Sequence, residues 1–165
     1  MTETPLMLTL SHQPALLGWA AAVQGNEGPW DWGLDAIAMG AVDRATGKVV
    51  AVMVMNSFFD DSCYVHIASD GARRWASPHV LRSFFGFMFD VKKVSRVIGV
   101  TPSENTAAVI AVIKLGFTIE GRIRSTRDGK KANIVSVMFR EDCPWLDQPQ
   151  IEGVPEDGQE IRTGS

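Results

Sequence analysis

Residues 62–78 have the sequence SCYVHIASDGARRWASP. In the first half of this stretch, side chains alternate as they do in a β-strand, so Tyr64 and His66 share one face. Near its end, Ser77 is a good N-cap and Pro78 is a good first residue of a helix. The stretch therefore predicts a strand, a basic loop and a helix in direct succession.

The loop of this unit, residues 70–77, combines the features of an anion site. A strand that leads into a helix leaves free backbone N–H groups at the helix start, where the helix dipole adds partial positive charge. Arg73 and Arg74 can add charge-assisted hydrogen bonds to a phosphate. The alternative is that both arginines are solvated surface charges. We favour the anion site because the strand, the basic loop and the capped helix occur together.

Hydrophobic spacing and turn residues predict the elements on both sides of this unit. The order along the chain is helix, three strands, helix, strand, helix and two strands. The central strand–helix–strand unit is expected to be a right-handed parallel crossover, and the flanking hairpins antiparallel. The sequence thus predicts an α/β domain with a mixed sheet and helices on its faces. The expected helices are 12–24, 77–90 and 104–114, and the expected strands are 36–42, 49–58, 62–69, 95–100, 118–124 and 132–140.

The chain length of 165 residues suits one domain with a sizeable core. We expect this domain to span residues 1–143. Residues 144–165 are dominated by Pro, Gly and acidic residues and are interpreted as a mobile tail of the isolated monomer. The alternative is an arm that docks on a neighbouring subunit through Ile151, Val154 and Ile161, which leaves a homo-oligomer open.

The composition disfavours two classes of partner. The chain has 16 Lys and Arg against 19 Asp and Glu, a formal net charge of −3, whereas nucleic-acid binders usually carry a basic excess. The longest apolar stretch, residues 36–59, is interrupted by the polar residues 43–48, so it predicts two strands and a turn instead of a membrane span. We therefore expect neither a nucleic acid nor a membrane as partner.

The cysteines and histidines show neither a metal-site spacing nor a disulfide framework. Cys63 and Cys143 lie far apart in the sequence, which favours a reducing compartment. His12, His66 and His79 lack the spacing of metal ligands. Because the first residues also lack the basic segment of a signal peptide, we expect a cytoplasmic protein that uses no metal.

Three short motifs follow one another downstream of the basic loop. Residues 105–108 read NTAA, residues 114–117 read KLGF and residues 120–124 read EGRIR. Together they resemble the signature of the GNAT superfamily of acetyl-CoA-dependent N-acetyltransferases, in the branch that includes the ribosomal-protein N-terminal acetyltransferases. The resemblance covers about residues 36–140.

This resemblance implies a GNAT-like fold, in which a central, mostly antiparallel sheet has one parallel β-α-β crossover and helices on both faces. It implies acetyl-CoA as the acyl donor and the amine of a small molecule or a peptide as the acceptor. The resemblance implies three groups of cofactor-binding residues. A backbone N–H of Ile67 or Ala68 would bind the thioester carbonyl, and Asn105 would contact the CoA arm. The pyrophosphate would be bound by Arg73, Arg74, Trp75, Ala76 and Ser77.

The catalytic residues are predicted from the chemistry of amine acetylation. The reaction needs a neutral amine, so a base must take a proton from it directly or through water. His66 and, second to it, Tyr64 are the candidates on the strand face that adjoins the expected thioester. The alternative for His66 is a hydrogen-bonded core residue, the commoner role of a single histidine in a strand. Glu104, Asp60 and Asp61 are further candidates, although acidic residues at loop ends are mostly solvated.

Three positions of the chain depart from the family pattern. The phosphate loop of the family is rich in glycine, whereas here Ala72 and Arg74 stand at its two glycine positions. Val112 stands where many members have a tyrosine that protonates the leaving thiolate. Either arginine side chains replace some backbone contacts to phosphate, or the cofactor site has decayed.

Two functions therefore stay open. The first is an N-acetyltransferase that moves the acetyl group directly from acetyl-CoA to an amine in a ternary complex, without a covalent intermediate. The second is a GNAT-fold protein that has lost the chemistry and serves as a binding or structural module in a larger assembly, because a fold does not imply a function. A loop in which arginine replaces glycine also suits acyltransferases of bacteriophage type.

Overall fold

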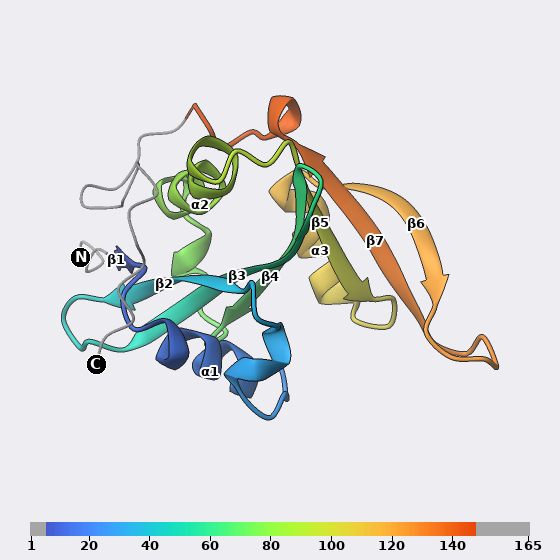
Figure 1. Cartoon of the computed structure of the whole chain (residues 1–165), viewed down its shortest axis with the longest axis horizontal. Coiled ribbons are helices and arrows are strands. Elements are labelled where there is room, and N and C mark those ends of the chain that lie inside the picture. The colour runs from blue at the N-terminus through green and yellow to red at the C-terminus, as the bar shows by residue number, and fades with distance from the viewer. Residues whose placement is uncertain (1–5, 148–165) are drawn as a thin grey trace.

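The computed structural model describes residues 6–147, which form one mixed sheet with helices on both faces (Figure 1). Most expected elements are present, with ends that differ by a few residues. Along the chain the elements are β1 (Leu6–Thr9), α1 (Gln13–Val23), the 3-10 helix η1 (Pro29–Trp32), β2 (Ile37–Asp43), β3 (Val49–Phe59), β4 (Ser62–Ser69), the 3-10 turn η2 (Arg74–Ala76), α2 (Pro78–Gly86), the π-helical turn η3 (Phe87–Val91), β5 (Arg96–Pro102), α3 (Thr106–Leu115), β6 (Thr118–Arg124), β7 (Ala132–Phe139) and the 3-10 turn η4 (Arg140–Asp142).

The strand order in the sheet is β1-β2-β3-β4-β5-β7-β6. Among the described strands, β4 and β5 form the parallel pair, and every other neighbouring pair is antiparallel. Parallel strands need a crossover connection, which α2 supplies here. The prediction of a mostly antiparallel sheet with one parallel β-α-β crossover is therefore confirmed.

Two apolar layers cover the two faces of the sheet. On one face, α2 and η3 bury an aromatic stripe in which Phe84, Phe85 and Phe87 are fully buried. On the opposite face, the small residues Ala20 and Ala21 let α1 approach the strands closely. The segment predicted as a helix over residues 77–90 is thus the centre of the larger layer.

The predicted elements need two corrections: one strand was not predicted, and one helix changes its type before its end. No strand was expected before the first helix, yet β1 pairs with β2 along its four residues. Four residues are too few to display a clear alternation, and the pairing with β2 makes them a strand. The helix expected over residues 77–90 is α-helical only to Gly86. It continues as η3, where Lys92 N–H donates to Phe87 O at 2.9 Å.

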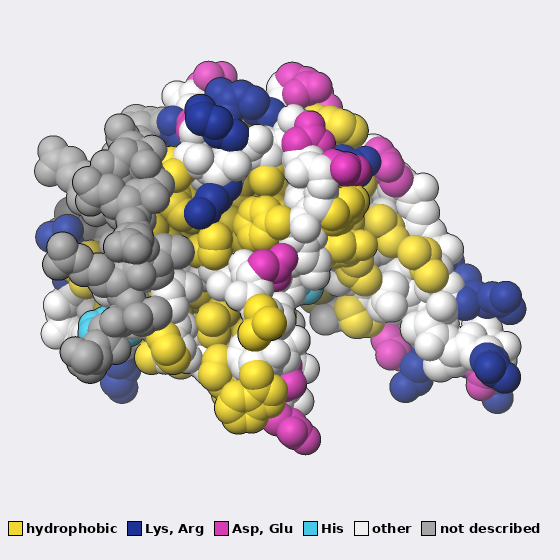
Figure 2. Space-filling model, viewed as in Figure 1, with side chains coloured by type: hydrophobic (Ala, Val, Ile, Leu, Met, Phe, Trp, Pro, Cys, Tyr) yellow, Lys and Arg dark blue, Asp and Glu magenta, His cyan; other side chains and the backbone are white. Residues whose placement is uncertain are grey.

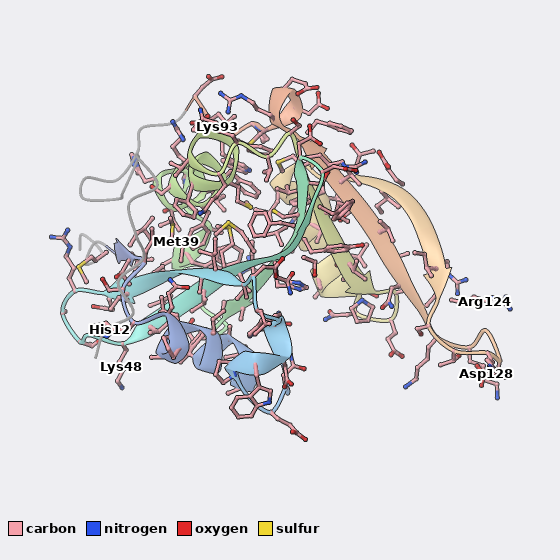
Figure 3. All side chains as sticks on the ribbon, viewed as in Figure 1. His12, Met39, Lys48, Lys93, Arg124 and Asp128 are labelled. Atoms are coloured by element: carbon pink, nitrogen blue, oxygen red, sulfur yellow. The ribbon has the colours of Figure 1, made fainter. Side chains whose placement is uncertain are left out.

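The β6–β7 hairpin projects from the body of the molecule, with Arg124 and Asp128 toward its far end (Figure 3). Basic side chains gather at that end (Figure 2). Beyond β7, Trp145 Nε1 donates to Leu115 O at 2.8 Å, so the chain still packs on the domain at this point. The rest of the expected tail, residues 148–165, lies outside the described residues.

Three further observations bear on the classes of protein considered above. No helix within residues 6–147 has the length and apolarity to cross a membrane. In the same part of the chain, no three His, Cys, Asp or Glu side chains gather as they would around a metal ion. Cys63 and Cys143 are both free thiols, and both are buried.

Candidate functional site

β4 and β5 pair over three residues and then separate. Residues 62–64 pair with residues 96–98, whereas β3 stays paired with β4 as far as Ser69. On the other side of the opening, β5 stays paired with β7 as far as Pro102. β3 and β7, the other neighbours of β4 and β5, therefore hold these two strands apart, and the sheet opens between β4 and β5.

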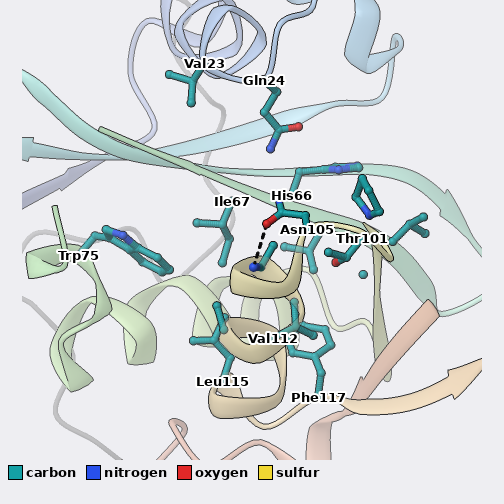
Figure 4. A pocket seen from close by; sticks show the side chains of 16 residues that line it. Val23, Gln24, His66, Ile67, Trp75, Thr101, Asn105, Val112, Leu115 and Phe117 are labelled. Atoms are coloured by element: carbon teal, nitrogen blue, oxygen red, sulfur yellow. Dashed lines mark hydrogen bonds between the residues drawn. The ribbon is translucent and has the colours of Figure 1, made fainter. Parts of the chain in front are cut away.

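The opening is a cavity of ≈ 460 Å³ that reaches both faces of the sheet (Figure 4). On one face it is bounded by Val23 and Gln24 at the end of α1. On the other face it is bounded by Trp75 and by Ala108 and Val112 of α3. The volume lies in the range of small-molecule sites. Two ligands that enter from opposite faces could meet within the sheet.

The backbone of β4 presents unpaired groups to this cavity. Asp70 N–H donates to Val50 O at 2.9 Å, so the even-numbered residues in the regular part of β4 direct their backbone groups to β3. The odd-numbered residues direct theirs to the side of β5, and Ile67 lies beyond the last residue that β5 pairs. Its N–H therefore faces the cavity, whereas that of Ala68 faces β3. Of the two predicted backbone donors, Ile67 is the one that fits the geometry.

His66 lines the cavity from the same strand. Its ring packs on the α1 side of the sheet, 4.9 Å from the ring of Trp32, centroid to centroid. Its Nε2 lies 3.0 Å from Oδ1 of Asn56. Burial lowers the pKa of His66 below its usual value, so the imidazole is uncharged at neutral pH. A neutral imidazole in a cavity wall can accept a proton from a ligand.

Tyr64 has the expected orientation but a different place. It lies in the paired part of β4, opposite Asn56 of β3, with its ring centroid 6.1 Å from that of Phe59. It is not among the residues that line the cavity. Of the two candidate bases, the structure thus brings His66 to the opening.

The loop between β4 and α2 places its two arginines differently. Arg74 Nη2 lies 2.7 Å from Oδ2 of Asp43 at the end of β2, and both side chains are partly buried. This hydrogen bond is the main reason why the pKa of Asp43 lies below its usual value. Arg73 is exposed, and no side chain among residues 6–147 forms an ion pair with it. Arg73 is therefore the loop arginine that is available to an anionic ligand.

The other residues of this loop connect the strand to the cavity and to α2. Gly71 has φ +93°, a backbone conformation that glycine adopts without strain, so it serves the turn out of β4. Trp75 lines the cavity, whereas Ala76 and Ser77 do not. Ser77 is the N-cap residue of α2, as predicted, although its side chain makes no capping hydrogen bond.

α3 contributes the helix start and one wall of the cavity. Asn105 is the N-cap residue, and its Oδ1 accepts a hydrogen bond from Ala108 N–H at 3.1 Å, drawn dashed in Figure 4. Asn105 also lines the cavity, as does Val112. An apolar side chain therefore occupies the position where the resemblance leads one to expect a tyrosine. Gly116 ends the helix with φ +106°, a backbone conformation that glycine adopts without strain.

The sequence-based interpretation missed three polar residues at this site. Asn56 joins His66 to the Trp32 carbonyl, to which its Nδ2 donates at 2.8 Å. One signal could have identified it, because Asn56 follows a long apolar run in β3. Gln24 and Thr101 line the cavity but stand near the ends of their elements, where polar residues are common for other reasons.

Comparison with known proteins gives matches to solved structures. No protein-family model matches the chain, and no curated protein does. One similar structure is the ribosomal-protein-S5-alanine acetyltransferase from Vibrio fischeri, at 15% identity and a TM-score of 0.54, covering 69% of this chain and 64% of that one. A second is a variant of the spermidine N-acetyltransferase SpeG from Vibrio cholerae, at 11% identity and a TM-score of 0.66, covering 84% and 96%.

A third similar structure is an acetyltransferase of the GNAT family from Bacillus anthracis, at 13% identity and a TM-score of 0.50, covering 63% of this chain and 66% of that one. The chain thus spans 64% of the length of the Vibrio fischeri protein and nearly all of the SpeG variant. Sequence identities this low show a shared fold but do not show a shared substrate. The sheet, with one parallel pair among its described strands, and the three matches agree: the chain has the GNAT acetyltransferase fold.

Proposed function

We propose that this protein is an N-acetyltransferase that moves the acetyl group of acetyl-CoA to the amine of a small molecule or a peptide. The observation that carries the proposal is the cavity through the sheet, which has His66 on the α1 side and α3 with Trp75 on the other. A donor and an acceptor that enter from opposite faces would meet between β4 and β5. Holding two reactants together removes much of the entropic barrier to their reaction.

The residues on the α3 side fit the donor. Acetyl-CoA would supply the activated acetyl group as a thioester. Its amide-containing arm needs hydrogen-bond partners, and the unpaired backbone carbonyl of Ile67 offers an acceptor. Trp75 and Val112 supply apolar walls. Arg73 is an exposed cation close to the start of α2, where a phosphate is favoured. Asn105 uses only Oδ1 for its cap and would keep its amide N–H groups for the donor.

Two groups of the chain would act on the reacting atoms. His66 would take the proton of the acceptor amine, and Ile67 N–H would stabilise the negative charge that develops on the carbonyl oxygen. The new C–N bond forms as the C–S bond breaks, and the proton passes from His66 to solvent. We favour direct transfer over an acyl-cysteine route because burial raises the pKa of Cys63 to about 12.

A second candidate function is a binding module that keeps the fold without the chemistry. Two observations favour it. The guanidinium of Arg74 is bound to Asp43, and the apolar Val112 has no proton to give to a leaving thiolate. We infer a reducing, cytoplasmic setting for either function, because both cysteines are free. The two functions differ in turnover and agree in the binding of CoA.

The experiment that separates them measures the release of CoA thiol from acetyl-CoA with a panel of amines. The panel includes spermidine and a peptide with an N-terminal alanine, because similar structures are named for these acceptors. We expect turnover with at least one amine. His66→Gln should lower it by ~10²-fold or more while calorimetry shows unchanged CoA binding.

The control variant is His12→Asn. His12 does not line the cavity, and asparagine tolerates its left-handed backbone, φ +62°. This variant should keep the turnover of the wild type. Full turnover in His66→Gln would place the base elsewhere. CoA binding without any thiol release across the panel would favour the binding module.

A further inference from the structure

Three groups that are distant in the sequence form a chain of hydrogen bonds behind His66. Asn56 lies buried at the end of the regular part of β3. Its Nδ2 donates to the backbone carbonyl of Trp32 at 2.8 Å. Its Oδ1 lies 3.0 Å from Nε2 of His66. The amide of Asn56 therefore bridges a fixed backbone acceptor and the imidazole.

The chemistry of these groups determines where the proton of the imidazole lies. The carbonyl of Trp32 can only accept, so the NH₂ group of Asn56 must face it and Oδ1 must face His66. An amide oxygen can only accept as well, so Nε2 of His66 carries the hydrogen. The opposite orientation of the amide would place two oxygens 2.8 Å apart. In the neutral ring, Nδ1 is then the nitrogen with the free lone pair.

The segment that carries the Trp32 carbonyl, the first acceptor in this series of hydrogen bonds, is fixed by several contacts. The side chain of Trp32 is buried against α1, and its Nε1 donates to Leu17 O at 3.0 Å. Directly after Asn56, the carboxylate of Asp35 accepts hydrogen bonds from Ser57 N–H at 3.0 Å and Phe58 N–H at 2.8 Å. The loop between α1 and β2 is thus bound to α1 through Trp32 and to β3 directly after Asn56 through Asp35, which fixes the acceptor of the Asn56 amide.

We propose that Asn56 is a positioning residue that keeps the imidazole of His66 in the Nε2–H tautomer, so that Nδ1 is the atom that takes the proton of the acceptor amine. This inference rests on the role of His66 in the proposed function. Without the Oδ1 acceptor, the ring would exchange between its two tautomers, and in part of the molecules Nδ1 would carry a hydrogen and could accept none. Through these hydrogen bonds, the loop that contains Trp32 helps to set the tautomer of His66, although the indole ring does not line the cavity.

Nitrogen-15 NMR of the three histidines tests the tautomer without any need for turnover. His66→Gln identifies the signals of His66, since the chain has only 3 histidines. We expect the wild type to show Nε2 as a protonated ring nitrogen and Nδ1 as an unprotonated one. In Asn56→Leu, which keeps the size and removes both hydrogen bonds, both signals should move toward the average of the two tautomers.

A matched control comes from another buried amide on the same face of the sheet. Gln13 donates to Leu10 O and Ala38 O and accepts from Ala38 N–H. Gln13→Leu should therefore lower stability as Asn56→Leu does, while the signals of His66 stay unchanged. A wild-type ring protonated at Nδ1, or a ring whose tautomer survives in Asn56→Leu, would overturn the inference.

Kinetics separate this inference from the proposed function. Asn56→Leu should lower kcat by about 2-fold or more with little change in the KM for acetyl-CoA, because rings that carry a hydrogen on Nδ1 cannot take the proton. An altered tautomer with an unchanged kcat would overturn the positioning role while leaving acetyl transfer intact. Full turnover in His66→Gln would instead remove His66 as the base of the proposed function, whichever tautomer the spectra show.

Discussion

At the scale of single residues, the burial of His66 makes the stability of the fold depend on pH. Burial lowers the pKa of His66 in the folded protein below the value of about 6.5 that it has in the unfolded chain. As the pH falls through this range, the unfolded chain binds a proton that the folded protein does not yet bind. The free energy of unfolding therefore decreases toward acidic pH.

His66→Gln removes this contribution. We expect the wild type to lose more stability than His66→Gln when the pH falls from about 7.5 to about 5.5, a span that brackets the pKa of a free histidine. Urea denaturation at the two pH values measures the difference. Equal losses in the wild type and in His66→Gln would show that His66 titrates as it does in water.

The two thiols are expected to be unreactive in the folded protein. Cys63 and Cys143 are buried, and burial raises the pKa of both, that of Cys63 to about 12. The thiolate is the reactive species, so a disulfide reagent at mildly alkaline pH should label neither thiol before unfolding and both afterwards. Absorbance of the released reagent measures this. Fast labelling of the native protein would contradict the packing, and Cys63→Ala would show which thiol is exposed.

The sequence could identify His66 but not the groups around it. Alternation along β4 already sets its face, whereas its partner Asn56 stands in another strand and depends on the register of β3 with β4. The ion pair of Arg74 with Asp43 spans a sequence separation of 31 residues. Local patterns do not encode the register that brings such residues together, so the loop arginines looked equivalent in the sequence.

At the scale of elements, the loop between β4 and α2 gives a prediction with a built-in control. Arg73→Ala should weaken CoA binding by roughly 10- to 100-fold, the effect of losing one charge-assisted hydrogen bond to phosphate. The melting temperature should stay unchanged because Arg73 is exposed and has no ion-pair partner among the described residues. Calorimetric titration with CoA and a thermal melt measure the two quantities.

Arg74→Ala should have the opposite pattern. It removes the partner of Asp43, so the melting temperature should fall by a few degrees while the affinity for CoA changes little. A loss of affinity in Arg74→Ala together with wild-type affinity in Arg73→Ala would mean that Arg74 leaves Asp43 when CoA binds.

Elements with strong local signals were predictable, and those made by tertiary contacts were not. The hairpin of β2 and β3 and the helix α3 carry clear turn and stop residues, and both are confirmed. β1 is a strand because β2 pairs with it. The segment around Pro29–Trp32 contains a buried Trp32 and an exposed Trp30. No local pattern distinguishes these two tryptophans, since only the packing of α1 does.

At the scale of the whole molecule, the sheet consists of two antiparallel blocks that meet over a short parallel contact. β1 to β4 form one block, and β5, β7 and β6 form the other. The sequence predicted the parallel crossover but not the separation of its strands, because strands expected over residues 62–69 and 95–100 could pair along most of their length. The site lies where that pairing stops after three residue pairs.

The proposed function requires that acetyl-CoA binds in this opening, and calorimetric titration of CoA into three proteins measures this binding. Ala108 lines the cavity and its neighbour Ala107 is exposed outside it, so Ala108→Trp should fill the site and Ala107→Trp should not.

We expect the wild type and Ala107→Trp to bind CoA equally well and Ala108→Trp to lose measurable binding. A ~100-fold excess over the dissociation constant should then stabilise the wild type by roughly 2.7 kcal/mol. Absence of both heat and a thermal shift in the wild type at millimolar CoA, or equal binding by Ala108→Trp, would contradict this expectation.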